Sequence, residues 1–382
     1  MMKVQQFIQQ NGLDALAEQF DITVKRYDNG YVKLNYSQIS SPKFHEICDE
    51  CRGLVLHVLP DNTSTVVARG FRRFYNLGEG TTSTFQFTGC TAFEKSDGSL
   101  TLVSFSPLDN KWIIGTRGMI YAEGNFTFSL TAAGGTFFDW ILKAMQLTEE
   151  EFQRCMRSFD PKCTYVMEYT APENLIVCRY PEAKMVLLSI IRNDTGAEEN
   201  TPSALLWTCN NLLQGGMNVR VPASYEFSSS AELVALADSL PGLQEGFVIV
   251  NHDTNERVKI KSKQYVAVHQ IRGEGVPSMN RLMELVLRNE QAEVLAYFPE
   301  FLQYVTPIEA ALATLLDEAE QQYAANMSLE SQKDFALAVK DSTVAPLLFK
   351  TRQAKTDVRA VWDQFDTNLQ SKLLEKYVCH PS

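Results

Sequence analysis

Several features of membrane, secreted and repeat proteins are missing from this 382-residue sequence. No apolar run approaches the length needed to span a bilayer, and the first residues contain no apolar core of a signal peptide. Internal repeats and low-complexity segments are also absent. We therefore expect a globular protein of the cytoplasm.

Positive charge is in short supply, because 35 Lys and Arg residues stand against 46 Asp and Glu residues, a net charge of −11 at pH 7. This balance argues against a protein that coats nucleic acid non-specifically. It permits a local basic groove, because the affinity for a charged ligand depends on the charges near the site. The length favours about two domains. The sequence does not determine the oligomeric state, although a monomer is favoured.

Cysteine is sparse, and its eight residues are scattered through a long chain, unlike the framework of a disulfide-rich secreted protein. Cys48 and Cys51 have the C-x-x-C spacing, with His45 and His57 close by. Zinc sites of this kind usually need a second pair, and the sequence has none. Free thiols are therefore the favoured interpretation, and metal or redox chemistry is the alternative.

Apolar periodicity divides the chain into two parts near residue 271. Residues 1–270 alternate in the manner of strands, with one hairpin at Asn29-Gly30 and a second around 251–255. Residues 175–177 look like a further buried strand. This part is predicted to contain antiparallel sheets with flanking helices.

Residues 271–382 carry apolar stripes at helical spacing. The clearest stripe consists of Val358, Val361, Trp362, Phe365, Leu369 and Leu373. Such stripes usually face a core and indicate no chemistry. The predicted fold class is therefore α+β, with a mixed domain over 1–270 followed by an all-helical domain over 271–382.

Lys95 occupies a distinctive position, between an apolar run and the turn Ser96-Asp97-Gly98-Ser99. A strand, a tight turn and a second strand would hold this lysine rigidly at the mouth of a fold. An amine is nucleophilic only when deprotonated, so positive neighbours that lower its pKa would favour covalent catalysis. We predict that Lys95 attacks a nucleotide α-phosphate, although a surface lysine beside a hairpin is the alternative from these residues alone.

Other charged residues form a set that suits nucleotidyl transfer. Lys259 and Lys261 are two apart on a predicted strand, so their ammonium groups share a face and would lower the pKa of a third lysine nearby. Glu168 and Glu245 could hold ribose hydroxyls and a divalent ion, since Mg²⁺ prefers a few hard oxygen ligands. Bidentate phosphate contacts would come from arginines, of which we single out Arg52, Arg73 and Arg117.

The order of these stretches resembles the covalent nucleotidyltransferase superfamily of ligases and capping enzymes, whose signature is Lys-x-Asp-Gly followed by a glutamate strand, a Glu-Gly strand and a Lys-x-Lys strand. Within it, the sequence most resembles the phage-type ATP-dependent RNA ligases that repair broken tRNA. The resemblance covers about residues 30 to 270. The stretches that carry it are Glu50-Cys51-Arg52-Gly53, Phe74-Tyr75-Asn76-Leu77, Lys95-Ser96-Asp97-Gly98-Ser99, Glu168-Tyr169-Thr170-Ala171-Pro172, Glu245-Gly246 and Val258-Lys259-Ile260-Lys261-Ser262.

The resemblance implies a role for each residue of the set. Lys95 would become lysyl-AMP, Glu168 would take the ribose, and Glu245 would help to place the metal. Glu94 would face the adenine amino group through its side chain or its backbone carbonyl. The triphosphate would meet Arg52, Lys259 and Lys261, with Arg73 and Arg117 at positions where the family often has lysine.

The resemblance also implies a reaction and its partners. ATP would be the co-substrate, with Mg²⁺ or Mn²⁺, and RNA with 5′-phosphate and 3′-hydroxyl ends, tRNA among them, would be joined through lysyl-AMP and 5′-adenylated RNA. If the gene belongs to a phage, the site of action would be the host cytoplasm. The helical domain is expected to recognise the folded shape of the RNA.

Two rival functions stay open at this point. A DNA ligase or an mRNA capping guanylyltransferase would share the lysine chemistry, but both usually carry a small β-barrel where this sequence is helical. A non-catalytic RNA-binding protein could use Phe71, Phe74 and Tyr75 beside Arg72 and Arg73 to stack bases and hold phosphates.

Overall fold

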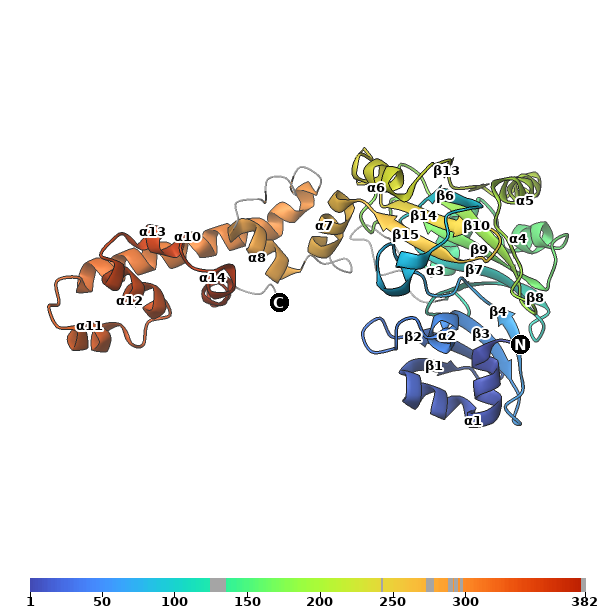
Figure 1. Ribbon diagram of the computed structural model, residues 1–382, viewed down its shortest axis with the longest axis horizontal. Coiled ribbons are helices and arrows are strands. Elements are labelled where there is room, and N and C mark those ends of the chain that lie inside the picture. The colour runs from blue at the N-terminus through green and yellow to red at the C-terminus, as the bar shows by residue number, and fades with distance from the viewer. Residues whose placement is uncertain are drawn as a thin grey trace. The chain divides into compact units, whose positions relative to one another are not determined.

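The computed structural model describes residues 1–123, 135–241, 243–272, 278–287, 291, 295 and 298–378. It separates into two compact units, Met1–Val266 and Ala267–Ser382, which are coloured along the chain in Figure 1. The division falls inside helix α7 (Lys263–Arg272), as does the boundary that the sequence suggests. Each unit is described by itself.

The first sheet of the first unit is antiparallel and has the order β1-β2-β3-β4. Its strands are β1 (Ile22–Arg26), β2 (Tyr31–Tyr36), β3 (Arg52–Val58) and β4 (Ser64–Ala68). The predicted hairpin at Asn29-Gly30 is confirmed, and Gly30 adopts the positive φ of 85° that this turn needs. Helix α1 (Lys3–Phe20) contributes Val4, Ile8 and Leu16 to the core beneath this sheet, and helix α2 (Glu46–Glu50) contributes Cys48.

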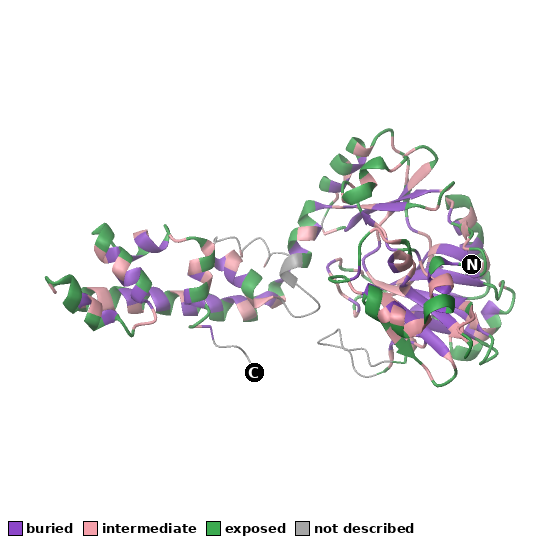
Figure 2. Ribbon diagram, turned by 60° about the horizontal axis from the view of Figure 1, so that its bottom comes forward, coloured by how far each residue is buried: buried purple, intermediate pink, exposed green. Residues whose placement is uncertain are grey.

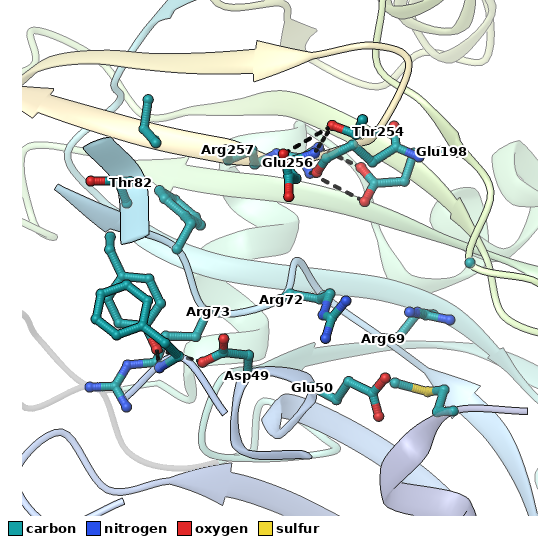
Figure 3. A pocket seen from close by; sticks show the side chains of 18 of the residues that line it. Asp49, Glu50, Arg69, Arg72, Arg73, Thr82, Glu198, Thr254, Glu256 and Arg257 are labelled. Carbon is teal, nitrogen blue, oxygen red and sulfur yellow. Dashed lines mark hydrogen bonds and ion pairs between the residues drawn. The ribbon is translucent and has the colours of Figure 1, made fainter. Parts of the chain in front are cut away.

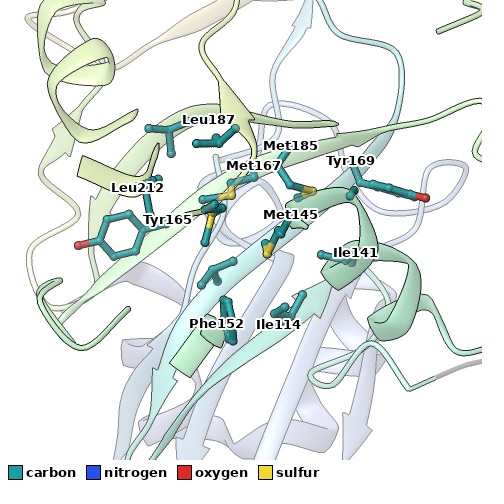
Figure 4. Packing of buried hydrophobic residues seen from close by; sticks show 14 of the residues in the cluster. Ile114, Ile141, Met145, Phe152, Tyr165, Met167, Tyr169, Met185, Leu187 and Leu212 are labelled. Atoms are coloured by element: carbon teal, nitrogen blue, oxygen red, sulfur yellow. The ribbon is translucent and has the colours of Figure 1, made fainter. Parts of the chain in front are cut away.

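The central sheet has the order β11-β10-β9-β7-β8, and β12 pairs with β10. Its strands are β7 (Ser99–Ser106), β8 (Lys111–Thr116), β9 (Cys163–Thr170), β10 (Lys184–Arg192), β11 (Glu198–Glu199) and β12 (Val219–Arg220). Helices α3 (Phe137–Met145), α4 (Glu149–Met156) and α5 (Pro202–Gln214) supply apolar side chains to the largest core. Figure 4 shows Met145, Phe152 and Leu212 of these helices beside Met167 and Met185 of the sheet.

The third sheet has the order β13-β6-β14-β15-β5. Its strands are β5 (Tyr75–Asn76), β6 (Cys90–Glu94), β13 (Ser224–Tyr225), β14 (Gly246–Asn251) and β15 (Arg257–Lys261). The predicted hairpin around 251–255 is confirmed as β14 and β15. Helix α6 (Ser230–Asp238) packs on this sheet through Leu233 and Ala237, and the short 3₁₀ helix η1 (Gly80–Thr84) follows β5.

The second unit contains helices and no strand among its described residues, as the apolar stripes predict. They are α8 (Met279–Leu287), η2 (Pro299–Phe301), α10 (Leu302–Asn326), α11 (Gln332–Val339), α12 (Ala345–Ala354), α13 (Val358–Trp362) and α14 (Thr367–Leu374). The predicted stripe is divided between α13 and α14, because the Asp366 carboxylate accepts from Leu369 N and starts a new helix. Figure 2 shows the buried sides of these helices in purple.

One sequence prediction about the fold is wrong. Residues 175–177 form part of a loop instead of a strand, although Val177 is completely buried.

Regarding membranes, none of the helices in the described ranges combines the length and the apolar character that a bilayer span requires.

Candidate active site

The backbone around Lys95 explains two glycines of the sequence motifs. Lys95 N donates to the carbonyl oxygen of Gly246 over 2.9 Å, which joins the end of β6 to the start of β14. A Cβ on Gly98 would lie 2.2 Å from Tyr169 O, and a Cβ on Gly246 would lie 2.0 Å from Ile260 O. Both positions therefore require glycine, because neighbouring strands approach too closely for any side chain.

Asp97, the acidic residue of Lys-x-Asp-Gly, ties the Lys95 turn to two other segments. Its carboxylate is buried and accepts from Val177 N at 2.8 Å, Cys178 N at 2.7 Å and the Tyr265 hydroxyl at 2.7 Å. These bonds fix the turn against the loop after β9 and the first turn of α7. The motif predicts Asp97 beside Lys95, but these contacts with distant segments cannot be predicted from it.

Glu245 lies between two lysines of the predicted site. Its carboxylate accepts from Lys95 Nζ at 2.7 Å and from Lys261 Nζ at 2.8 Å. The Glu245 side chain is 2% exposed, whereas those of Lys95 and Lys261 keep 21% and 25% of their surface. The two lysine side chains thus keep some exposed surface, whereas the carboxylate that joins them is buried.

The prediction that positive neighbours lower the pKa of Lys95 is wrong. Burial opposes the charge of Lys95, but the carboxylates of Glu245, Glu168 and Asp97 outweigh burial and raise its pKa. Sequence analysis counted the lysines around Lys95 but could not see that Glu245 reaches between them. The raised pKa favours the charged form of Lys95, which pairs with Glu245.

Lys259 is the lysine of this site whose pKa falls, to about 8, because of burial and then the charges of Lys261, Lys95 and Arg52. Its Nζ lies 5.6 Å from the centre of the Phe74 ring. Across the site, burial raises the pKa of Glu168 to about 7, although Lys95 and Arg52 oppose the rise. These mutual effects show that the predicted lysines, Glu168 and Arg52 lie together.

The three predicted arginines gather around a residue that sequence analysis did not single out. Arg73 and Arg117 both lie over the Tyr36 ring, and the Tyr36 phenol also influences Arg52. The sequence pattern around Tyr36 does not distinguish it, since many core residues are single tyrosines at the end of a predicted strand.

Glu94 has its side chain committed elsewhere. Arg220 on β12 holds both carboxylate oxygens, at 3.1 and 3.2 Å, and Ala223 N donates to the same group at 3.4 Å. Arg220 is a second residue that sequence analysis missed. The Glu94 carboxylate is therefore occupied by protein groups, which weakens the prediction that it faces a base and leaves the backbone carbonyl as the alternative.

A cavity of about 620 Å³ lies next to this site and is drawn in Figure 3. Arg73 and Phe74 line it, but Lys95 does not. Figure 3 also shows Arg257 in an ion pair with Glu198, whose carboxylate neutralises the charge of the arginine. The cavity therefore meets the Lys95 site at Arg73 and Phe74 and at Val258, the residue before Lys259.

The C-x-x-C cysteines are both buried and free. Burial raises the pKa of Cys48 to about 11 and that of Cys51 well above its ordinary value. Within the described ranges, no cluster of three or more His, Cys, Asp or Glu side chains is arranged to hold a metal ion. Neither thiol is therefore suited to act as a nucleophile at neutral pH.

Comparison with known families decides how this set should be interpreted. A family model described as RNA ligase, of the T4 type, matches residues 50–265, which contain every residue of the predicted site. The chain belongs to the RNA ligase family. Its nucleotidyltransferase resemblance, inferred above from short motifs, agrees with this match.

Individual relatives of this RNA ligase family member are distant. A protein of Autographa californica nuclear polyhedrosis virus, described as a bifunctional polynucleotide kinase/RNA ligase, is 28% identical over 93% of this chain and 50% of its own length. The chain thus spans about half the length of that relative. Among solved structures, an archaeal ATP-dependent RNA ligase is 13% identical, with a TM-score of 0.47 and coverage of 90% of this chain and 79% of that one. A Naegleria gruberi RNA ligase variant with ATP and Mn is 17% identical, with a TM-score of 0.36 and coverage of 47% and 51%.

Proposed function

We propose that this protein is an ATP-dependent RNA ligase that joins a 5′-phosphate to a 3′-hydroxyl through lysyl-AMP and 5′-adenylated RNA. The observation that carries the proposal is the position of Lys95, which pairs with Glu245 and lies among Lys259, Lys261 and Glu168 inside the matched family region. Gathering partly buried charges of both signs around a lysine costs free energy, and such clusters are typical of functional sites.

In the first step, Lys95 Nζ attacks the α-phosphorus of ATP. A phosphorus–nitrogen bond forms, the bond to the β-phosphate oxygen breaks, and pyrophosphate leaves with the electron pair. Lys95 must first lose a proton to solvent, and its contact with Glu245 opposes this loss in the nucleotide-free protein. We propose that attack requires the Lys95–Glu245 ion pair to open, so that the amine can give up its proton and face the α-phosphorus.

The second and third steps use the same cations. A 5′-phosphate oxygen of RNA attacks the α-phosphorus of lysyl-AMP, and the lysine leaves and regains a proton. The RNA 3′-hydroxyl then attacks the 5′-phosphorus, loses its proton, and displaces AMP. Each step exchanges one phosphoryl leaving group for another, so fixed charges at Lys259, Lys261 and Arg52 would serve all three.

A divalent ion, Mg²⁺ or Mn²⁺, fits the acidic groups of this site. Glu168 forms no side-chain hydrogen bond or ion pair with any other described residue, and Glu245 lies across from it among the lysines. Two carboxylates are few, but Mg²⁺ is often held by one or two together with phosphate oxygens and water. We propose that Glu245, with Glu168 nearby, helps to hold the ion, which would neutralise charge that develops on the phosphates.

Other parts of the assignment follow from the family. We propose that Glu168 also meets the ribose, that the Glu94 carbonyl accepts from the adenine amino group, and that Arg73 and Arg117 contact the triphosphate with Arg52. The viral relative's name joins a polynucleotide kinase to an RNA ligase, and such kinases make the 5′-phosphate ends that this reaction consumes. Broken tRNA is the proposed substrate, supported only by the motif resemblance.

The helical unit and the compartment complete the proposal. Helices α8 to α14 would recognise the folded shape of the RNA, as expected for a part of the chain without the motifs of catalysis. The cytoplasm, or the host cytoplasm for a phage protein, is the proposed compartment, since the described cysteines are free thiols.

A transfer experiment separates this function from its rivals. The protein, charged with labelled AMP, is offered 5′-phosphorylated single-stranded RNA and nicked duplex DNA, and parallel charging reactions contain labelled GTP. The proposal expects transfer to RNA and ligated RNA product. Faster sealing of nicked DNA would favour a DNA ligase, labelling by GTP would favour a capping enzyme, and failure to bind any label covalently would leave only an RNA-binding protein.

A further inference from the structure

Arg69 and Arg72 line the cavity next to the Lys95 site, and Figure 3 shows both side chains. They belong to the segment that connects β4 to β5. Further walls of the cavity come from the turn between β10 and β11, residues 194–196, and the turn between β14 and β15, residues 254–256. The volume of about 620 Å³ is large enough for a nucleotide.

Arg69 is held in place although nothing pairs with its charge. Its backbone N donates to Thr164 Oγ1 at 3.1 Å, and its guanidinium lies against Gly196, where an added Cβ would stand 2.7 Å from Arg69 Nη1. The Nε atom of Arg69 is buried and has no hydrogen-bond partner among the described residues. A buried donor without an acceptor is unfavourable, so a ligand that accepts from this group would remove the penalty.

Arg72 lies three residues further along the same segment and is exposed. Within the described part of the chain, it forms no ion pair. Burial lowers the pKa of Arg69, Glu50 and Glu198 oppose this effect, and the charge of Arg72 adds to it. The two guanidinium groups are therefore close enough to repel each other, and an anion bound to both would relieve the repulsion.

The carboxylates that line the cavity do not supply this anion. Glu198 binds Arg257 through both of its oxygens and also accepts from Ser189 Oγ. The other acidic side chains each accept from a group other than the two arginines: Asp49 from the Tyr75 hydroxyl, Glu50 from Val4 N, Asp194 from Thr195 N and Glu256 from Thr254 Oγ1. The cavity thus contains charges of both signs, but its carboxylates have partners and these two arginines have none.

Phosphodiester groups are the ligands that suit this pair. A guanidinium binds two phosphate oxygens through parallel hydrogen bonds, and two arginines on one segment offer two such groups. The cavity also continues the Lys95 site at Arg73, Phe74 and Val258. An RNA end that lies at Lys95 during the proposed transfer therefore has this cavity beside it for the adjoining part of its strand.

We propose that Arg69 and Arg72 bind phosphodiester groups of an RNA strand close to the end that is joined. The inference rests on the proposed function, which brings RNA to this protein. The strand that carries the 5′-phosphate and the strand that carries the 3′-hydroxyl present the same chemical group, and the experiment distinguishes them.

Fluorescence anisotropy of the full chain with a labelled 5′-phosphorylated RNA oligonucleotide, at several salt concentrations, tests the site. Arg69→Gln and Arg72→Gln are each expected to bind roughly tenfold more weakly, and the slope of log affinity against log salt should become shallower by about 0.7 in each. Arg72→Lys keeps the charge and should recover most of the native slope. Arg154→Gln is the matched control and should bind as the native protein does, because Arg154 is an exposed arginine of the same unit outside the cavity.

Uncharged methylphosphonate groups, placed one at a time in the RNA, locate the contact. At the contacted phosphate, this replacement should weaken binding by the native protein but hardly change binding by Arg72→Gln, in which the contact is already lost. Native affinity and native salt slope in both glutamine variants would overturn the proposal. An equal loss in Arg154→Gln, or methylphosphonate effects that are the same in native protein and variants, would also overturn it.

Joining reactions with synthetic 5′-adenylated donors assign the strand. With a mononucleotide donor, only the acceptor strand contains phosphodiesters, so a raised KM for the acceptor in the glutamine variants identifies the strand with the 3′-hydroxyl. A raised KM that appears only for long donors identifies the strand with the 5′-phosphate. Native KM values for both strands would refute the site.

The outcomes also separate this inference from the proposed function. A native protein that binds RNA through these arginines but never forms an AMP adduct would refute the ligase assignment and leave the phosphodiester site supported. A native protein that joins RNA, with both glutamine variants binding RNA as tightly as it does, would refute only the phosphodiester site.

Discussion

Replacing Glu168 by glutamine should make the nucleotide-free protein more stable at alkaline pH. Burial raises the pKa of Glu168 from its ordinary 4.5 to about 7, so the folded protein binds this proton more tightly than the unfolded chain does. Stability is therefore highest where the group is protonated in both states, below about pH 4.5, and it is lost as the pH rises from 4.5 to about 7.

The size of the effect follows from the same two values. The difference between 4.5 and about 7 corresponds, at about 1.4 kcal/mol per pH unit, to about 3 kcal/mol of unfolding free energy above pH 7. Glu168 keeps some contact with solvent, so this figure is an upper value. Glutamine has nearly the same shape and no charge to bury. The Glu168→Gln variant should therefore not lose this unfolding free energy as the pH rises.

Urea unfolding of the native protein and of Glu168→Gln at pH 5 and pH 8 measures the effect. The native protein should lose up to about 3 kcal/mol relative to the variant between these two conditions. Glu199→Gln, which removes an exposed carboxylate of the same unit, is the control and should follow the native protein. Parallel behaviour of native protein and Glu168→Gln would refute the reasoning. The variant should also lose AMP transfer, so that stability and activity change in opposite directions.

Three further predictions concern single positions. Gly98→Ala should unfold at a markedly lower temperature than native, because its Cβ would lie 2.2 Å from Tyr169 O, whereas Gly118→Ala, with open space around the Cβ, should not. The affinity for ATP should fall between pH 7 and pH 9 as Lys259, whose pKa is about 8, loses its charge, and Lys259→Arg should remove most of this pH dependence in a titration. Lys33→Met should raise stability to urea at pH 6 by several kcal/mol, since burial lowers the pKa of Lys33 to about 7, and the gain should disappear as the pH rises towards 10.5.

Much of the site could be predicted because its residues lie in short, ordered motifs. The alternation around Asn29-Gly30 and 251–255 predicts hairpins, and strand pairing then brings Lys261 opposite Gly246 and next to Glu245. Lys259 and Lys261 share a face simply because they are two residues apart on a strand. These are local relations, which sequence patterns report directly.

Relations between distant segments could not be predicted in the same way. Nothing in the sequence shows that the Glu245 carboxylate reaches Lys95, which reverses the direction expected for the pKa of that lysine. Residues 175–177 have the composition of a strand. However, the backbone N–H of Val177 donates a hydrogen bond to the Asp97 carboxylate, and the segment is a loop. Tyr36 also becomes significant only when the fold brings the arginines over its ring.

In the proposed reaction, the Lys95 amine carries the adenylate. Intact-mass spectrometry of the native protein and of Lys95→Ala, each incubated with ATP and Mg²⁺, tests it most directly. The native protein should gain the mass of one AMP group, peptide mapping should locate it on Lys95, and the variant should gain nothing. An adduct of the same yield on Lys95→Ala, or RNA sealing by that variant at the native rate, would contradict it.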